Sequence, residues 1–304
     1  MCWFYMEYKI SIGIPAFNEE SNISDLLGAI VTQKMGRFKI DEIIVVSSGS
    51  TDKTDAIVET FSGKDSRIRL IRQVKREGKA SAINEFIKAA HNKILVLESA
   101  DTIPDNNTIE KLCLPLANSR VGMTGARPIP VNDSNRLMGY VSHLLWSLHN
   151  QLAVKSPKCG ELVAFRKIFR GLPKDTAVDE AWIEYEIWKR NFRIVYVSEA
   201  TVYNKGPETV SDFLRQRRRI AFGHLDLSKR TEFKVSTSNF LSILSAILAE
   251  FPFKEPKKWI FLTCAFILEG MGRFLGYYDY HKKTHHSVWE ISETTKSLGI
   301  QGSH

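Results

Sequence analysis

Short apolar runs alternate with stretches of helical periodicity along the first part of the chain. Four apolar runs give way to polar loops: residues 10–14, 42–46, 68–71 and 94–98. Helical periodicity follows the first three runs, starting near residues 21, 53 and 79. Strands that alternate with helices of 10 to 15 residues form β-α-β units with right-handed crossovers and a parallel sheet. The pattern therefore predicts an α/β fold with a mostly parallel sheet flanked by helices.

Candidate ligands follow the fourth run, Ile94–Glu98. The run breaks into Ser99, Ala100 and Asp101, with Pro104 close behind. Ligands of open α/β sheets bind beyond the carboxyl ends of the strands, so we expect Asp101 to face a ligand crevice. Hard oxygen donors in this position suit Mg²⁺ or Mn²⁺ bound together with a substrate diphosphate. The alternative is that Asp101 only caps a turn before the proline.

Four loops at successive strand ends carry a resemblance to a known family. They are IPAFNEE (14–20), IIVVSSGSTDKT (43–54), EGKASAIN (77–84) and SADTIP (99–104). Their order and spacing resemble those of family 2 glycosyltransferases, which are inverting enzymes that use nucleotide-sugar donors. The resemblance covers roughly the first 225 residues. It implies the GT-A fold, a Rossmann-like sheet flanked by helices, and a hexosyltransferase activity.

The resemblance also implies roles for residues of these loops. It places the nucleoside pocket at Pro15, Ala16 and Glu19, and it places Lys79 near the base or ribose. Asp101 corresponds to the final Asp of the family's D-x-D motif, which binds the metal. A dehydrogenase is excluded, because no G-x-G-x-x-G follows any predicted strand.

Two positions of the donor site depart from the family pattern. Ser48 stands where many relatives have an Asp that accepts a hydrogen bond from uracil, and Ser99 stands at the first Asp of D-x-D. The hydroxyl of Ser48 can still donate or accept a hydrogen bond, so a UDP-sugar and a GDP-sugar both stay open. With one carboxylate fewer, we expect the metal to be held mainly by Asp101 and the donor diphosphate.

Two segments of the second half resemble the family's acceptor side. Residues 158–166 resemble the segment that closes over the acceptor, where Gly160 permits close backbone approach. Asp179 and Glu180 resemble the family's Glu-Asp motif in inverted order, and by register Glu180 occupies the position of the catalytic base. Such a base takes the acceptor hydroxyl proton as that oxygen attacks the anomeric carbon. The alternative is that both residues match the dipole of a helix start.

A basic run, QRRRI at residues 216–220, resembles the Q-x-x-R-W motif of membrane-linked members. The resemblance implies that Gln216 and Arg219 lie near the acceptor and the diphosphate, and on a helix the two share one face. Ile220 replaces the motif's Trp, which is evidence against a long-chain polymerase. His224 could also reach the diphosphate, or it could be a structural histidine.

The C-terminal part changes in composition. Residues 235–249 carry no charge, and residues 259–278 are apolar and aromatic apart from Glu269 and Arg273. Neither has 18 uncharged residues in a row, so neither is predicted to span a membrane. Lysines lie between them, at 254, 257 and 258. We predict two helices in a membrane interface, with a hairpin packed on the catalytic domain or on a second subunit as the alternative.

The net charge, the cysteines and the N-terminal sequence indicate the partners and the location of the protein. A net charge of +8 favours polyanionic partners such as nucleotide phosphates and anionic lipid. The cysteines lie far apart and no signal peptide is visible, so we expect a cytoplasmic protein with reduced thiols, peripheral on the cytoplasmic face of the cell membrane. We predict a catalytic domain at residues 1–228 and a membrane-associating or oligomerisation region at 229–304.

The predicted function is transfer of a sugar from a UDP- or GDP-sugar to a lipid-linked or glycan acceptor, with Mg²⁺ or Mn²⁺. Nucleic acid is not an expected partner, and a homo-oligomer stays open. One alternative is a nucleotidyltransferase, which would need a basic Gly-rich loop directly after the first strand, where this chain has PAFNEE. The other is a non-catalytic basic scaffold that binds anionic membrane or RNA.

Overall fold

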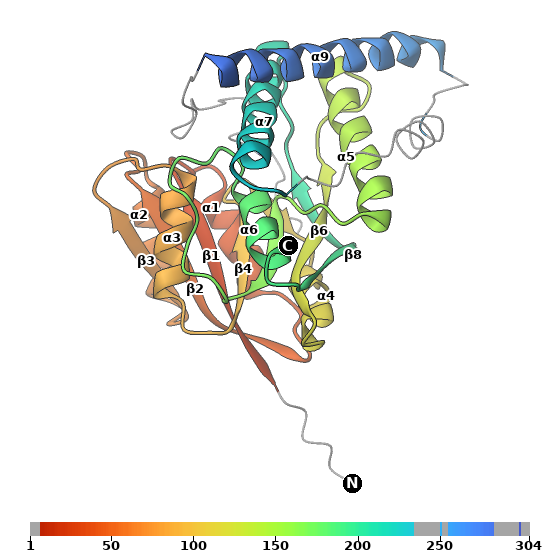
Figure 1. Ribbon diagram of the computed structural model, residues 1–304. Coiled ribbons are helices and arrows are strands. Elements are labelled where there is room, and N and C mark those ends of the chain that lie inside the picture. Colours follow the sequence, from red (N-terminus) through yellow and green to blue (C-terminus); the bar gives the residue numbers. More distant parts are fainter. Residues whose placement is uncertain (1–6, 234–249, 251–254, 283–297, 299–304) are drawn as a thin grey trace.

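A computed structural model describes residues 7–233, 250, 255–282 and 298. Its strands form one 8-stranded sheet in the order β3-β2-β1-β4-β7-β6-β8-β5. β7 runs antiparallel to its neighbours β4 and β6, β5 runs antiparallel to β8, and the other neighbours are parallel. The sheet is therefore mixed, with helices on both faces (Figure 1). The predicted α/β class is confirmed.

The strands and helices have the following bounds. The strands are β1 (Tyr8–Ala16), β2 (Phe38–Ser48), β3 (Ile68–Gln73), β4 (Ile94–Glu98), β5 (Thr102–Pro104), β6 (Val121–Pro130), β7 (Leu162–Arg166) and β8 (Arg193–Asn204). The helices are α1 (Ile23–Val31), α2 (Thr54–Ser62), α3 (Lys79–Ala89), α4 (Thr108–Cys113), the 3-10 helix η1 (Leu114–Ala117), α5 (Leu137–Lys155), α6 (Asp179–Trp188), α7 (Val210–Arg230) and α9 (Pro256–His281). The sequence did not predict β5 or β7.

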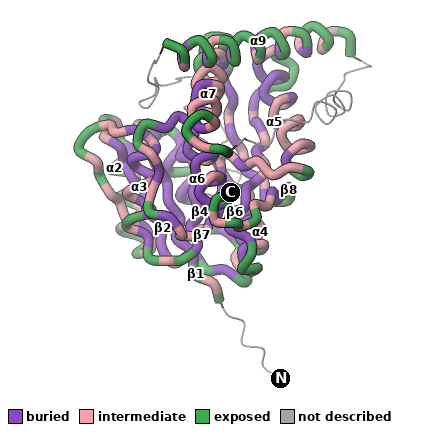
Figure 2. The backbone as a smooth tube through the Cα atoms, in the orientation of Figure 1, coloured by how far each residue is buried: buried purple, intermediate pink, exposed green. Residues whose placement is uncertain are grey.

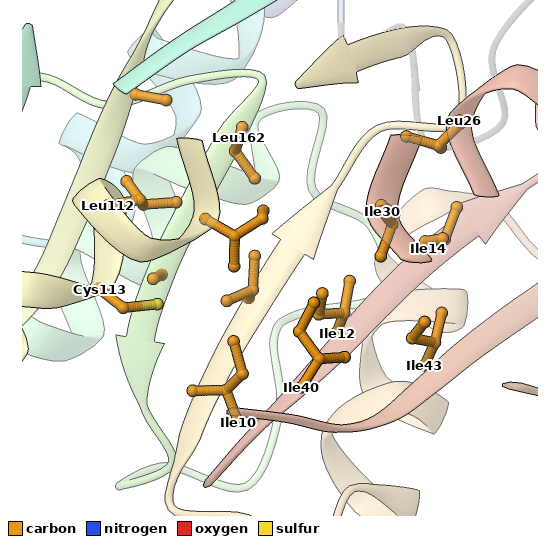
Figure 3. Packing of buried hydrophobic residues seen from close by; sticks show 14 of the residues in the cluster. Ile10, Ile12, Ile14, Leu26, Ile30, Ile40, Ile43, Leu112, Cys113 and Leu162 are labelled. Atoms are coloured by element: carbon orange, nitrogen blue, oxygen red, sulfur yellow. The ribbon is translucent and has the colours of Figure 1, made fainter. Parts of the chain in front are cut away.

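The core forms where the inward face of the sheet meets the first helices. Ile10, Ile12 and Ile14 alternate along β1 and are fully buried on one face, because strand side chains have a period of two. Leu26 and Ile30 of α1 pack against this face (Figure 3). Burial of each such side chain contributes about 1.5–3 kcal/mol, so this layer fixes the sheet on which the loops are built.

Strand register decides which loops meet. β1 pairs in parallel with both β2 and β4, so the carboxyl ends of these three strands lie at one edge of the sheet. β7 runs the opposite way, and its first residue, Leu162, pairs with Glu98, the last residue of β4. The residues just before β7 therefore lie beside the residues just after β4.

α5, α7 and α9 build a separate helical layer above this edge (Figure 1). Leu144 of α5, Phe213 of α7 and Leu262 of α9 belong to one buried cluster. α9 crosses close to α7: a Cβ added at Gly272 would lie 2.5 Å from Arg217 Cβ, and one at Gly276 would lie 2.5 Å from the Arg218 carbonyl oxygen. The sequence left two options for this region, contact with a membrane or packing on the catalytic domain. α9 has one face packed on the other helices and one exposed face (Figure 2).

Two acidic residues of α9 pair with arginines of α7. Glu269 accepts a hydrogen bond from Arg217 at 2.6 Å and from Arg273 at 2.8 Å, and Asp279 pairs with Arg218. Residues 258–281 are long and apolar enough to cross a membrane by length and composition alone. Their longest uncharged run, residues 259–268, is shorter than 18 residues. The other apolar stretch, 235–249, lies outside the described residues.

Candidate functional site

A cavity of about 1040 Å³ opens at the carboxyl edge of the sheet, beneath the layer of α5, α7 and α9. Loops that are distant in sequence line it together. Among the predicted site residues, the lining contains Pro15, Ala16, Glu19, Ser48, Lys79, Ser99, Asp101, Glu180, Gln216, Arg219 and His224. Asp179 is the one predicted site residue outside this lining, and it is 1% exposed.

Hydrogen bonds hold the first two loops in place. The Glu19 backbone N–H donates to Thr54 Oγ1 at 2.7 Å, and the Glu19 carboxylate accepts from Asn22 Nδ2 at 3.1 Å. Ser48 Oγ accepts from the Glu77 backbone N–H at 3.1 Å. The loops after β1 and β2 and the loop before α3 therefore form one tied wall of the cavity.

Gly49 explains how that wall closes. It has a φ of +72°, and a Cβ at this position would lie 2.6 Å from the backbone nitrogen of Arg76. Only glycine combines this left-handed conformation with so close a backbone approach. On the same wall, the Arg76 guanidinium lies 4.3 Å from the centre of the Phe17 ring.

Lys79 and Glu180 form an ion pair at the floor of the cavity. Lys79 Nζ lies 2.8 Å from Glu180 Oε1 and 3.3 Å from Ser99 Oγ. Burial raises the pKa of Glu180, but attraction and the hydrogen bond from Lys79 outweigh it, so the pKa lies below its usual value. Glu180 is therefore a carboxylate at neutral pH.

Asp179 has a different environment from its neighbour. Burial raises the pKa of Asp179 to about 7, partly opposed by the charge of Lys79. Neither carboxyl oxygen has a hydrogen-bond partner among the described residues. The two adjacent carboxyls are thus distinct: Glu180 faces the cavity in its ionised form, and Asp179 lies behind it.

Carboxylate and amide oxygens from three strand ends converge around Asp101. Glu161, the residue before β7, and Asn204, the last residue of β8, line the cavity with it. Asn204 Nδ2 donates to Glu161 Oε1 at 3.5 Å, and Ser99 Oγ donates to the Glu161 carbonyl oxygen at 3.4 Å. Burial and the nearby charge of Asp101 raise the pKa of Glu161 to about 7.

Basic residues gather at the side formed by α7. Burial lowers the pKa of Arg219 to about 10, while the carboxylates of Asp179 and Glu180 oppose this shift, so the guanidinium stays charged. Burial and nearby cations lower the pKa of His224 to about 3. His224 is therefore neutral at physiological pH and can offer a diphosphate a hydrogen bond but no charge.

The lining also includes polar residues that the sequence did not single out as site residues, among them Glu161, Glu184, Asn204 and Lys158. Glu184 lies one helical turn after Glu180 and accepts a hydrogen bond from the Cys159 backbone N–H at 2.5 Å. The signal for Glu161 was its place directly after Gly160, in a segment already assigned to the acceptor side. Asn204 had no such signal, because its position depends on the pairing of β8 with β5.

Comparisons with known sequences agree with this geometry. The sequence model described as Glycosyl transferase family 2 matches residues 11–172, and that of Glycosyl transferase family group 2 matches residues 94–278. A dolichyl-phosphate beta-glucosyltransferase from Trichomonas vaginalis is 27% identical over 177 residues, covering 52% of this chain and 52% of the relative. A poly-beta-1,6-N-acetyl-D-glucosamine synthase from Staphylococcus epidermidis is 22% identical over 227 residues, covering 70% of this chain and 54% of the relative. The chain thus spans about half the length of these curated relatives.

A solved structure shares the fold. A mannosyltransferase from Pyrobaculum calidifontis, determined in complex with GDP-Man and Mn²⁺, superposes with a TM-score of 0.64 and 19% sequence identity. The similarity covers 91% of this chain and 88% of that one. The predicted GT-A fold is confirmed.

Proposed function

The chain belongs to glycosyl transferase family 2, and on this premise we propose that it transfers a sugar from a UDP- or GDP-sugar to a lipid, lipid-linked saccharide or glycan acceptor with inversion at the anomeric carbon. One observation carries the proposal: the ionised Glu180 carboxylate faces the same cavity as the four donor loops. A general base and a donor site in one cavity are what a direct displacement requires.

Glu180 is the proposed base. It accepts the proton of the acceptor hydroxyl as that oxygen attacks the anomeric carbon from the face opposite the leaving diphosphate. Lys79 keeps the carboxylate ionised and oriented through its 2.8 Å hydrogen bond. Asp179 lies buried behind it, and in its ionised form it attracts Lys79 and Arg219.

Asp101 is the proposed ligand for Mg²⁺ or Mn²⁺. Its surroundings fit such a cation, because the Oδ1 of the buried Asn204 has no hydrogen-bond partner among the described residues. Within the same residues, no group of three or more His, Cys, Asp or Glu side chains could hold a metal ion, so the diphosphate would have to supply further ligands. When bound, the cation would neutralise negative charge on the leaving diphosphate.

The residues that line the cavity indicate where the donor nucleotide and its diphosphate would bind. We propose that Pro15, Ala16 and Glu19, with Ser48 and Ser99, line the nucleoside and diphosphate region, because the tied loops bring them to one wall. Gln216 and Arg219 on α7 would contact the diphosphate from the opposite side, with neutral His224 as a hydrogen-bond donor beside them.

The lipid-type acceptor is proposed from α9 and from the named relatives. The Trichomonas vaginalis relative is named for a dolichyl-phosphate acceptor, and α9 covers the cavity while exposing apolar side chains such as Ile260 and Phe274. We propose residues 1–228 as the catalytic domain and 229–304 as a region that associates with the cytoplasmic face of a membrane, or with a second copy of the chain. Glu269 and Arg273 of α9 line the cavity, so this region also completes the site.

Donor hydrolysis in the presence of Mg²⁺ or Mn²⁺ tests the proposal. A panel of UDP-, GDP- and dTDP-sugars in a thermal-shift assay should reveal the donor, because a ligand at 100 times its Kd adds about 2.7 kcal/mol of stability. Stabilisation by one nucleotide class that disappears with EDTA is the expected result. Absence of both stabilisation and hydrolysis with every donor would overturn it.

A further inference from the structure

The residue opposite Ser99 is a glutamate that lies directly before β7. β7 runs antiparallel to β4, with Leu162 paired to Glu98. One step further along this register brings Glu161 to Ser99, and Ser99 Oγ donates to the Glu161 carbonyl oxygen at 3.4 Å. Ser99 is the position at which the sequence lacks the first carboxylate of a D-x-D pair.

We infer that Glu161 supplies the second carboxylate for the divalent cation, beside Asp101 and next to the neighbouring strand, with Asn204 Oδ1 as a further oxygen ligand. The inference rests on the proposed function and deepens it. Two carboxylates plus substrate phosphates are a usual ligand set for Mg²⁺. Glu161, directly before β7, thus compensates for the carboxylate that is absent from the loop after β4.

The backbone of Glu161 supports a functional role. Its φ of +58° lies in the left-handed region, which is uncommon for a residue with a Cβ. Such conformations cost of order 1–3 kcal/mol and persist where the surrounding structure holds them. Glycine would adopt this backbone without the cost. The presence of a glutamate here therefore indicates that its carboxylate has a role.

Asn204 provides an independent observation. It is 6% exposed and lines the cavity, yet its Oδ1 has no hydrogen-bond partner within the described parts of the chain. A buried polar atom without a partner costs about 1–3 kcal/mol. Its Nδ2 donates to Glu161 Oε1 at 3.5 Å, so the amide lies against the Glu161 carboxylate. A cation at this point would satisfy the oxygen.

Mn²⁺ binding to the full chain, measured by the loss of the free-ion EPR signal, tests the inference apart from catalysis. Each titration is run with GDP and with UDP. Loss of an outer-sphere partner already weakens metal affinity about 10- to 100-fold, so Glu161→Gln should raise the Mn²⁺ Kd by at least about tenfold. Glu199→Gln, which removes an exposed carboxylate outside the cavity lining, is the matched control and should change the Kd less than about twofold.

Glu161→Gly separates metal binding from folding. It suits the left-handed backbone, so it should keep or raise the melting temperature while it loses Mn²⁺ affinity as Glu161→Gln does. Wild-type affinity in both Glu161 variants, with loss in Asp101→Asn, would overturn the role of Glu161 and leave the proposed function standing. No Mn²⁺ binding by the wild type with either nucleotide would overturn both.

Discussion

Lys79 Nζ lies 2.8 Å from Glu180 Oε1, so the first residue of α3 is joined to the first turn of α6 across 101 positions of sequence. The two side chains are 22% and 20% exposed, which leaves the pair within reach of a ligand in the cavity. Lys79 neutralises the charge of Glu180 beside the proposed donor loops. We therefore expect donor binding and the ionisation of the proposed base to be coupled.

Replacement of Glu180 by Gln should lower turnover by a factor of about 10² to 10⁴, the range for loss of a general base. The amide keeps the size of the side chain, so donor affinity measured by calorimetry should stay nearly unchanged. Asp179→Asn serves as the comparison, because Asp179 does not line the cavity. An inactive Asp179→Asn beside an active Glu180→Gln would show that the register of the base is wrong.

Replacement of Lys79 by Met should move the acidic limb of the kcat–pH profile to higher pH. Lys79 lowers the pKa of Glu180, so its removal raises that pKa. Activity requires the ionised carboxylate, and ionisation then begins at a higher pH. Lys174→Met removes a lysine that is 74% exposed and should leave the limb in place. If the acidic limb of Lys79→Met did not shift, ionisation of Glu180 would not be the cause of the pH dependence.

The sequence was sufficient for the parts of the site that lie just after parallel strands. Asp101 could be placed because a β-α-β pattern fixes which end of each strand carries the loop, whereas Lys79 was placed by the resemblance of its loop to the family. Glu161 could not be placed, because β7 runs antiparallel and its neighbour is set by long-range pairing with β4. The contact between Arg217 and Glu269 likewise depends on how α9 docks, 52 residues further along the chain.

Replacement of Asp101 by Ala should abolish metal-dependent donor binding and leave the fold intact. Asp101 lines the cavity at the end of β4, and Ser99 beside it offers no carboxylate in its place. Calorimetry with a nucleotide sugar and Mn²⁺ measures the loss, and circular dichroism checks the fold. Asp105→Ala, four residues on and outside the cavity lining, is the control. An affinity equal to that of wild type would remove Asp101 from the metal site.

Two glycines of α9 should respond in opposite directions to the same substitution. A Cβ at Gly276 would lie 2.5 Å from the Arg218 carbonyl oxygen and 2.6 Å from Ala221 Cβ, whereas a Cβ at Gly270 meets nothing within 4 Å. Gly270→Ala should therefore stabilise the helix by about 0.5–1 kcal/mol. Gly276→Ala should lower the melting temperature, because it separates α9 from α7. Equal shifts of the same sign would contradict the observed packing of the two helices.

The exposed face of α9 should bind membranes. Ile260, Ile267 and Phe274 recur every seven residues, so they share one face, and they are 66%, 56% and 68% exposed. Burial of a large apolar side chain contributes about 1.5–3 kcal/mol, so a membrane that buries all three side chains would bind α9 tightly. The triple substitution of these residues by Ser should abolish flotation with anionic liposomes while donor binding, which uses the opposite side of the layer, persists.

Salt and a matched control distinguish the sources of that binding. Lysines near the start of α9 would add roughly 1 kcal/mol each beside anionic lipid, and this share should weaken with salt while the apolar share persists. Val74 and Val154 are exposed apolar residues elsewhere, at 104% and 60%, and their double substitution by Ser should leave flotation unchanged. A wild-type chain that stays with the soluble fraction at low and high salt, and runs as a dimer that the triple variant loses, would make this face of α9 an oligomerisation surface instead.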